Sequence, residues 1–157
     1  KLLFADEPTT ALDVTVQAQV LALMMDWRDL CCSASINSSH NMGVIAETAD
    51  RVMVMYAGRV VEQAPVSRLF ERPVHPYTRG LLACVPTLEQ DTSRLAAIPG
   101  SLPEPGRRPD GCRFAPRCRW RIEACRTTLP PLVEQDPGHA AACIRAADVA
   151  NTAGQSA

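Results

Sequence analysis

The sequence predicts an α/β fold for the first half of the chain and an irregular, cysteine-bearing second half. Residues 2–7 run from apolar side chains directly into two acids, and apolar residues recur at helical spacing within residues 14–29. Two β-rich runs follow at residues 51–56 and 59–63. A buried strand that ends in charge and is followed by a helix is typical of open α/β sheets, which bind ligands at the carboxyl ends of their strands. We therefore expect functional residues where the first strand ends.

Length and composition limit the class of protein. The 157 residues suffice for one ordinary domain or two small ones. The formal net charge of -1 gives no global field that would recruit nucleic acid or a membrane surface. No apolar run approaches the ~20 residues needed to span a bilayer, and we expect no secretion signal, because no basic-then-apolar segment occurs in the sequence. Because the chain begins with Lys1 inside a predicted strand, we expect it to be the C-terminal part of a longer protein.

The first predicted strand ends in two adjacent acids, Asp6 and Glu7. Two adjacent acids can form part of a Mg²⁺-nucleotide site, since one holds the metal through oxygen and the other acts on water. The alternative is that they only cap a strand in another kind of α/β protein. The string LLFADEPTTALD, residues 2–13, resembles the Walker B strand and D-loop of ABC-type ATPases. The resemblance implies that Asp6 serves Mg²⁺, that Glu7 polarises the attacking water, and that Asp13 is the D-loop acid that faces a partner subunit.

A helix over residues 14–29 is predicted, with Asp13 as its N-cap. The ABC resemblance implies a buried strand next, but residues 31–39 are small and polar, whereas such strands are continuous apolar runs. Two explanations are open: a weakened strand, or a short reading-frame slip that is restored before His40. Good resemblance on both sides of the stretch favours the slip.

Residues 40–52, HNMGVIAETADRV, again resemble the ABC family, in which a switch histidine ends the strand and a helix follows. The resemblance implies that His40 hydrogen-bonds the γ-phosphate and helps to place the attacking water. Asn41 stands where the family usually carries an acid. The runs 51–56 and 59–63 are joined by Ala57-Gly58, which predicts a β-hairpin.

A second discriminating string lies at residues 73–82, PVHPYTRGLL. It resembles the His-Pro-Tyr segment of the oligopeptide/dipeptide and nickel branch of ABC importers. In physical terms it is a turn followed by a short helix, and we interpret His75 as structural. Prolines and glycines break any regular element from Pro86 to Gly111, which predicts a wrapping loop or a linker.

Four of the seven cysteines form a module with the spacing C-x5-C-x6-C-x17-C, namely Cys112, Cys118, Cys125 and Cys143. An odd number of cysteines without a secretion signal argues against a disulfide framework. Four thiolates can hold an iron–sulfur cluster, zinc sites more often have closer pairs, and free cysteines are also common packing residues. Nearby arginines would favour the thiolate form of these cysteines. Because the arginine-rich segment shows no recognition-helix pattern, we do not expect it to bind nucleic acid. The string GCRFAPRC resembles the extension of peptide-importer ATPases, which implies a structural or regulatory 4Fe-4S cluster.

The resemblance implies two parts. Residues 1–85 would be the C-terminal half of a P-loop ABC nucleotide-binding domain, and residues 86–157 an irregular extension with the four-cysteine module. The parent would be the ATP-hydrolysing subunit of a di- or oligopeptide importer on the cytoplasmic face of a bacterial membrane. Its partners would be a second ATPase subunit, permease subunits and, indirectly, a peptide-binding protein.

The chain contains no G-x-x-x-x-G-K motif followed by Ser or Thr, so it has no phosphate loop of its own. We therefore expect no ATP turnover by this chain alone. The alternatives are a zinc or iron–sulfur module whose ATPase half is vestigial, and an inactive gene fragment.

Overall fold

The structure is a computed structural model that describes residues 1–85, 97–104 and 106–152. Contacts divide the chain into two compact units, residues 1–49 and residues 50–157, which we call the N-terminal and C-terminal units and describe separately. Part of the predicted linker, residues 86–96, lies outside the described residues. The expected boundary at residues 85 and 86 thus lies inside the C-terminal unit and remains a prediction.

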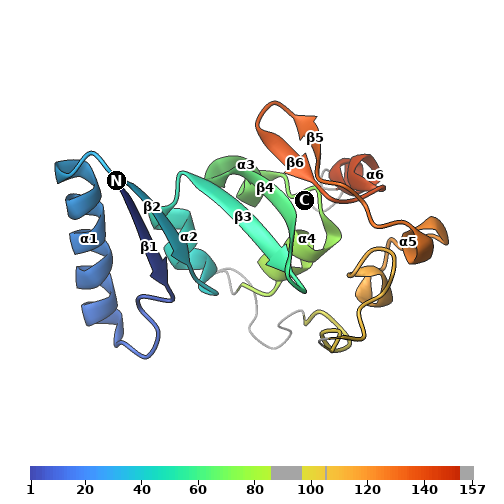
Figure 1. Ribbon diagram of the computed structural model, residues 1–157, viewed down its shortest axis with the longest axis horizontal. Coiled ribbons are helices and arrows are strands. Elements are labelled where there is room, and N and C mark those ends of the chain that lie inside the picture. Colours follow the sequence, from blue (N-terminus) through green and yellow to red (C-terminus); the bar gives the residue numbers. More distant parts are fainter. Residues whose placement is uncertain (86–96, 105, 153–157) are drawn as a thin grey trace. The chain divides into compact units, whose positions relative to one another are not determined.

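The N-terminal unit contains a parallel strand–helix–strand arrangement (Figure 1). Its elements are β1 (Leu2–Asp6), α1 (Val14–Leu30), β2 (Ala34–Ser38) and α2 (Met42–Thr48). Strands β1 and β2 pair in parallel, with Leu2 opposite Ala34 and Asp6 opposite Ser38. Because parallel strands end at the same edge of a sheet, the residues that follow β1 and β2 are brought together there. Helix α1 confirms the helix that was predicted over residues 14–29.

The polar stretch after α1 forms a strand in spite of its composition. Residues 34–38 pair along their whole length with β1, and Ile36, the only large aliphatic residue among them, is 41% exposed. Backbone pairing with β1 therefore defines this strand, while burial of its side chains contributes little. The proposed reading-frame slip is a property of the gene, which the structure does not test, so it remains a prediction.

The C-terminal unit is built around an antiparallel sheet with the strand order β3-β4-β6-β5. Strands β3 (Arg51–Tyr56) and β4 (Arg59–Pro65) form the predicted hairpin. Both turn residues, Ala57 and Gly58, have positive φ angles of 48° and 79°, which is the turn geometry that matches the twist of a hairpin. Helices α3 (Val66–Glu71) and α4 (Pro76–Ala83) follow.

The second half of the chain is less irregular than the sequence predicted. Two of its segments, β5 (Val133–Asp136) and β6 (His139–Ala141), join the sheet, because β6 pairs with β4. The other elements are the 3-10 turn η2 (Ala115–Arg117) and helices α5 (Ala124–Thr127) and α6 (Ala146–Asn151). Sequence patterns missed β6 because three residues are too few to show a periodicity, and their partner strand lies about 77 residues earlier.

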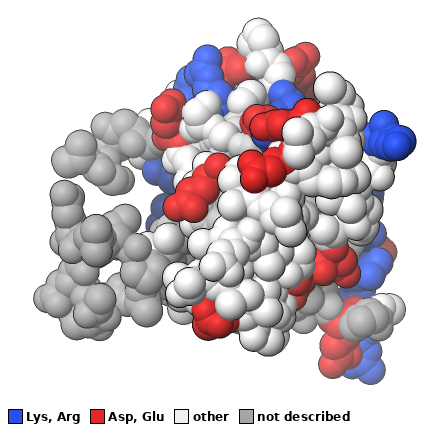
Figure 2. Space-filling view, turned by 90° about the vertical axis from the view of Figure 1, so that its left-hand side faces the viewer, with Lys and Arg blue, Asp and Glu red and all other residues white. Residues whose placement is uncertain are grey.

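The core lies in the C-terminal unit. Alternate residues of β3 are buried, and the fully buried side chains include Leu69 and Val149. The N-terminal unit buries only Leu21, Met42 and Val44 among its hydrophobic residues, and α1 exposes Leu23 at 69%. Figure 2 shows one face of the molecule, on which uncharged surface separates scattered acidic side chains and the basic side chains lie toward its edges.

Candidate functional site

The first candidate site lies where β1 and β2 end. Strand pairing sets Asp6 opposite Ser38, and the Ser38 hydroxyl donates a short hydrogen bond to the Asp6 carboxylate. The backbone N–H of Glu7 donates to the same hydroxyl oxygen at 2.9 Å. Ser38 therefore fixes the Asp6 carboxylate and the backbone that presents Glu7.

The Glu7 carboxylate has a defined partner on each oxygen. Thr10 donates its hydroxyl proton to Oε2 at 2.8 Å, and His40 Nδ1 lies 3.1 Å from Oε1. These hydrogen bonds, first that of Thr10 and then that of His40, lower the pKa of Glu7 below its ordinary value. Glu7 also adopts a positive φ of 45°, a conformation that few non-glycine residues adopt. The carboxylate is thus ionised at neutral pH and oriented by its neighbours.

The structure brings together three of the four residues predicted for the nucleotide site. Asp6, Glu7 and His40 lie at one sheet edge, joined through Ser38 and by the contact between Glu7 and His40. An ionised carboxylate beside an imidazole can orient and polarise a water molecule. Among the described residues, no group of three or more His, Cys, Asp or Glu side chains is placed to hold a metal ion. A Mg²⁺ ion at Asp6 would therefore need most of its ligands from water and phosphate, as is usual for this ion.

Asp13 has a different role in the structure. Its Oδ1 accepts hydrogen bonds from the backbone N–H groups of Thr15 and Val16, both at 3.0 Å, and so caps helix α1 as predicted. Asn41 caps α2 in the same way, through Gly43. The proposed contact of Asp13 with a partner subunit remains a prediction.

Sequence reasoning missed Ser38 and Thr10. Ser38 lay in the stretch that was treated as anomalous, and its signal was its position: it ends the strand that pairs with β1. Thr10 was part of the recognised string, but no role was assigned to it. Both are short hydroxyl side chains, whose partners depend on the fold rather than on sequence spacing.

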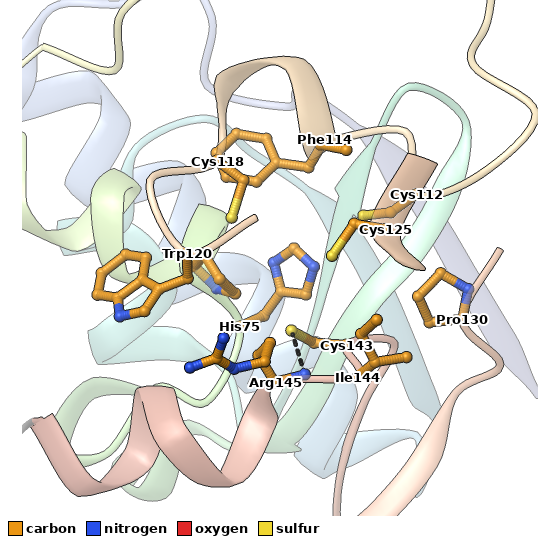
Figure 3. A pocket seen from close by; sticks show the side chains of 12 residues that line it. His75, Cys112, Phe114, Cys118, Trp120, Cys125, Pro130, Cys143, Ile144 and Arg145 are labelled. Carbon is orange, nitrogen blue, oxygen red and sulfur yellow. Dashed lines mark hydrogen bonds between the residues drawn. The ribbon is translucent and has the colours of Figure 1, made fainter. Parts of the chain in front are cut away.

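The second candidate site is a pocket in the C-terminal unit that all four module cysteines line (Figure 3). They come from distant segments: Cys112 precedes η2, Cys118 follows it, Cys125 lies on α5 and Cys143 follows β6. The remaining lining is mainly apolar and aromatic, with His75, Phe114 and Trp120 among it. The structure thus gathers the four cysteines that the spacing singled out; Cys31, Cys32 and Cys84 do not line this pocket.

Burial governs the protonation of these thiols. Desolvation raises the pKa of Cys112 and Cys118 above the ordinary thiol value and that of Cys143 to about 12. Without a ligand these groups are therefore neutral thiols at pH 7. For Cys118, desolvation outweighs the attraction of Arg119, so the pKa of this thiol is raised in spite of the nearby guanidinium.

Most of the neighbouring arginines have other partners. Arg117 donates to the carbonyls of Ile98 and Pro99, Arg126 pairs with Glu123, and the Arg119 guanidinium lies 3.8 Å from the Trp120 ring centroid. The groups that do approach the sulfur atoms are backbone amides. The N–H of Ile122 donates to Cys125 Sγ at 3.5 Å, and the N–H of Arg145 donates to Cys143 Sγ at 3.3 Å.

His75 lies in the same pocket, and its structural role is clear. It is 1% exposed, and its Nδ1 accepts a hydrogen bond from the backbone N–H of Tyr77 at 3.1 Å, which caps α4. Burial lowers the pKa of His75 to about 4, so the ring is neutral at pH 7. The structural interpretation of His75 fits this geometry; its place among the cysteines was not predicted.

Comparison with known proteins finds relatives among peptide-transport ATP-binding proteins. Residues 61–125 match the family described as oligopeptide/dipeptide transporter, C-terminal region. A probable peptide ABC transporter ATP-binding protein of Sinorhizobium fredii is 53% identical over 152 residues, which are 96% of this chain and 45% of that protein. The oligopeptide transport ATP-binding protein AppD of Bacillus subtilis is 50% identical over 144 residues, 92% of this chain and 44% of that protein.

A third relative, from Brucella melitensis and named as a peptide import ATP-binding protein, is 52% identical over 143 residues, covering 91% of this chain and 43% of that protein. The chain spans less than half the length of each of these relatives. The chain is thus similar to part of these peptide-transport ATP-binding proteins, and its residues 61–125 match the C-terminal region of oligopeptide/dipeptide transporters.

Proposed function

We propose that this chain is part of the ATP-hydrolysing subunit of an ABC importer for di- or oligopeptides. The observation that carries the proposal is the contact between the Glu7 carboxylate and His40 Nδ1, beside Asp6 at the carboxyl ends of two parallel strands. The names of the relatives indicate peptide import and ATP binding. The substrates are ATP and, for the assembled importer, a peptide.

Each site residue has a role in this proposal. Asp6 would supply an oxygen ligand to Mg²⁺, whose charge stabilises the phosphate oxygens during transfer. Glu7, held ionised by Thr10 and His40, accepts a hydrogen bond from the attacking water and orients it. His40 donates to the γ-phosphate, and Asp13 faces the partner ATPase subunit while it caps α1. The phosphate loop is not part of this chain.

The partners follow from the same proposal. A second ATPase subunit completes the nucleotide site, transmembrane permease subunits carry the peptide, and a peptide-binding protein delivers it. The subunit would lie on the cytoplasmic face of the bacterial inner membrane. In the part of the chain that the structure describes, no helix is long and apolar enough to cross a membrane.

Substitutions in the full-length subunit test the catalytic roles. We expect Glu7→Gln and His40→Ala each to lower ATP hydrolysis by about 10²-fold or more, because each removes a group that positions the water, while ATP binding is retained. Hydrolysis is measured by phosphate release and binding with a fluorescent ATP analogue. Glu47→Gln, at an exposed position on α2, is the matched control and should leave both unchanged. Full hydrolysis by Glu7→Gln would overturn the assignment.

The 157-residue chain alone is a separate test. Since it carries no phosphate loop, we expect no Mg²⁺-dependent ATP turnover from the purified chain. Turnover that is abolished by Glu7→Gln would contradict this expectation.

We also propose that the four-cysteine pocket holds a 4Fe-4S cluster with a structural or regulatory role. Four thiols from separate segments line it, and backbone N–H groups point at the sulfur atoms of Cys125 and Cys143. Such hydrogen bonds stabilise the charge of a thiolate-bound cluster. Zinc sites more often have pairs of cysteines two to four residues apart, whereas these cysteines are spaced C-x5-C-x6-C-x17-C. The donor set therefore favours a cluster over zinc.

Metal analysis tests this part of the proposal. After anaerobic incubation with ferrous iron and sulfide, we expect the chain to bind about four irons and four sulfides, as a Cys₄-held [4Fe–4S] cluster requires. Cys118→Ser should bind much less, whereas Cys84→Ser, which changes a thiol outside the pocket, should bind the wild-type amount. Stoichiometric zinc with no iron would overturn the cluster.

A metal-binding module with a vestigial ATPase half is the second candidate function. The observation that favours it is the C-terminal unit itself, which contains the whole pocket together with most of the core. It predicts cluster binding together with a full-length protein that hydrolyses no ATP. An inactive gene fragment would show neither.

A further inference from the structure

The imidazole of His75 is fixed in orientation and in tautomer. Its Nδ1 accepts a hydrogen bond from the backbone N–H of Tyr77 at 3.1 Å. In a neutral imidazole with Nδ1 as acceptor, the proton resides on Nε2. The backbone around the ring is also fixed, because the N–H groups of Val74 and His75 donate to the buried carboxylate of Glu62 at 2.8 and 3.0 Å.

The ring lies among the four cysteines. Figure 3 shows the His75 imidazole in the middle of the pocket, with Cys118, Cys112, Cys125 and Cys143 around it. Among the described residues, the side chain of His75 forms its hydrogen bond through Nδ1. The helix-capping role of His75 thus leaves Nε2–H available as a donor in a pocket whose lining, apart from the cysteines and Arg145, is apolar and aromatic.

We propose that His75 is a positioning residue for the bound cluster, with its Nε2–H donating a hydrogen bond to the sulfur atoms held in the pocket. This inference rests on the cluster proposed above. A neutral N–H dipole stabilises added negative charge without introducing a net charge into an apolar site. The same residue then both starts α4 and adjusts the electron affinity of the cluster.

The direction of the effect follows from the charge. Reduction adds one electron to the cluster, and hydrogen bonds to its sulfur atoms favour the more negative state. Loss of the Nε2–H donor should therefore shift the midpoint potential to a lower value. If His75 only caps α4, a substitution that preserves the cap should leave the midpoint potential of the cluster unchanged.

His75→Asn separates the two roles, because Asn is a good N-cap residue but lacks the imidazole Nε2–H. The 157-residue chain and this variant are loaded anaerobically with iron and sulfide, and the midpoint potential is measured by redox titration followed by EPR. We expect equal iron and sulfide content and a lower potential in the variant. Tyr77→Phe, which alters a neighbouring side chain that does not line the pocket, is the control and should keep the wild-type potential.

An unchanged potential in a fully loaded His75→Asn variant would overturn the role of His75 and leave the cluster intact. A wild-type chain that binds no iron would overturn the cluster itself, and this inference with it. If the variant does not fold, wild-type chain labelled with ¹⁵N in the histidine rings is reduced and studied by pulsed EPR. We expect a weak hyperfine coupling to a ring nitrogen; absence of the coupling overturns the proposal.

Discussion

At the scale of single residues, the buried carboxylate of Glu62 on β4 has hydrogen-bond partners on two other segments. Its side chain is fully buried, and its two oxygens accept hydrogen bonds from the backbone N–H groups of Val74 and His75 and contact His139 Nε2 at 2.7 Å. Burying a carboxylate is costly unless its lone pairs are satisfied. Here they are satisfied from two other segments, the turn before α4 and strand β6. Glu62 therefore connects β4, the turn before α4 and β6.

The first prediction at this scale concerns Glu62→Ala. The substitution leaves two backbone N–H groups and the buried His139 without their acceptor, so we expect a loss of about 3 kcal/mol or more in the free energy of unfolding. Urea denaturation monitored by circular dichroism measures it. Glu47→Ala, on the exposed surface of α2, should change the value by no more than about 0.5 kcal/mol. An equally small effect of Glu62→Ala would show that the network contributes nothing to stability.

The sequence identified some of the functional and structural residues and missed others. Asp6 and Glu7 were singled out because an apolar run ends in them, and His40 because residues 40–52 resemble the ABC family. The parallel pairing of β1 and β2 explains why the three lie together. Glu62 was not singled out, because within its β-rich run it resembles any solvent-facing acid. Its burial depends on His139, 77 residues away, and no local pattern contains that information.

At the scale of elements, helix α1 is the clearest agreement between sequence and structure. Apolar spacing and an N-cap residue predicted it over residues 14–29, and it spans Val14–Leu30 with Asp13 as the cap. The hairpin of β3 and β4 was predictable for the same reason, since its signals are local. Strand β2 was implied by the family resemblance alone, because its polar residues pair with β1 through the backbone and give no apolar run.

The cap of α1 supports a prediction for this element. Asp13→Ala removes the acceptor for the N–H groups of Thr15 and Val16, so we expect a loss of about 1 kcal/mol in stability. Asp13→Asn keeps an acceptor oxygen and should lose much less. Thermal denaturation of both variants gives the comparison. Equal losses would indicate that the charge of Asp13, rather than its hydrogen bonds, stabilises the helix.

At the scale of the whole molecule, the sheet of the C-terminal unit crosses the boundary that composition predicted. Proline and glycine content changes after residue 85, which led to the expectation of a separate extension. Strand β6 nevertheless pairs with β4, with Glu62 opposite Ala141 and Gln63 opposite Ala140. Proline and glycine content predicts only where the local backbone is irregular, whereas strand pairing depends on contacts between residues that are distant in the sequence. The four-cysteine pocket is consequently built on the same sheet as the hairpin.

This arrangement predicts that the hairpin depends on the last thirty residues of the chain. A chain that ends at residue 127 lacks β5, β6 and α6, and so loses the partner strand of β4 and the His139 side chain at Glu62. We expect amide hydrogen exchange at β4, and at Val74 and His75, to become much faster in that chain, because their acceptors are exposed to water. Amides of α1 in the N-terminal unit serve as the internal control and should keep their protection. If the β4 amides also kept theirs, residues 50–85 would be stable without the extension, and the boundary expected from composition would hold after all.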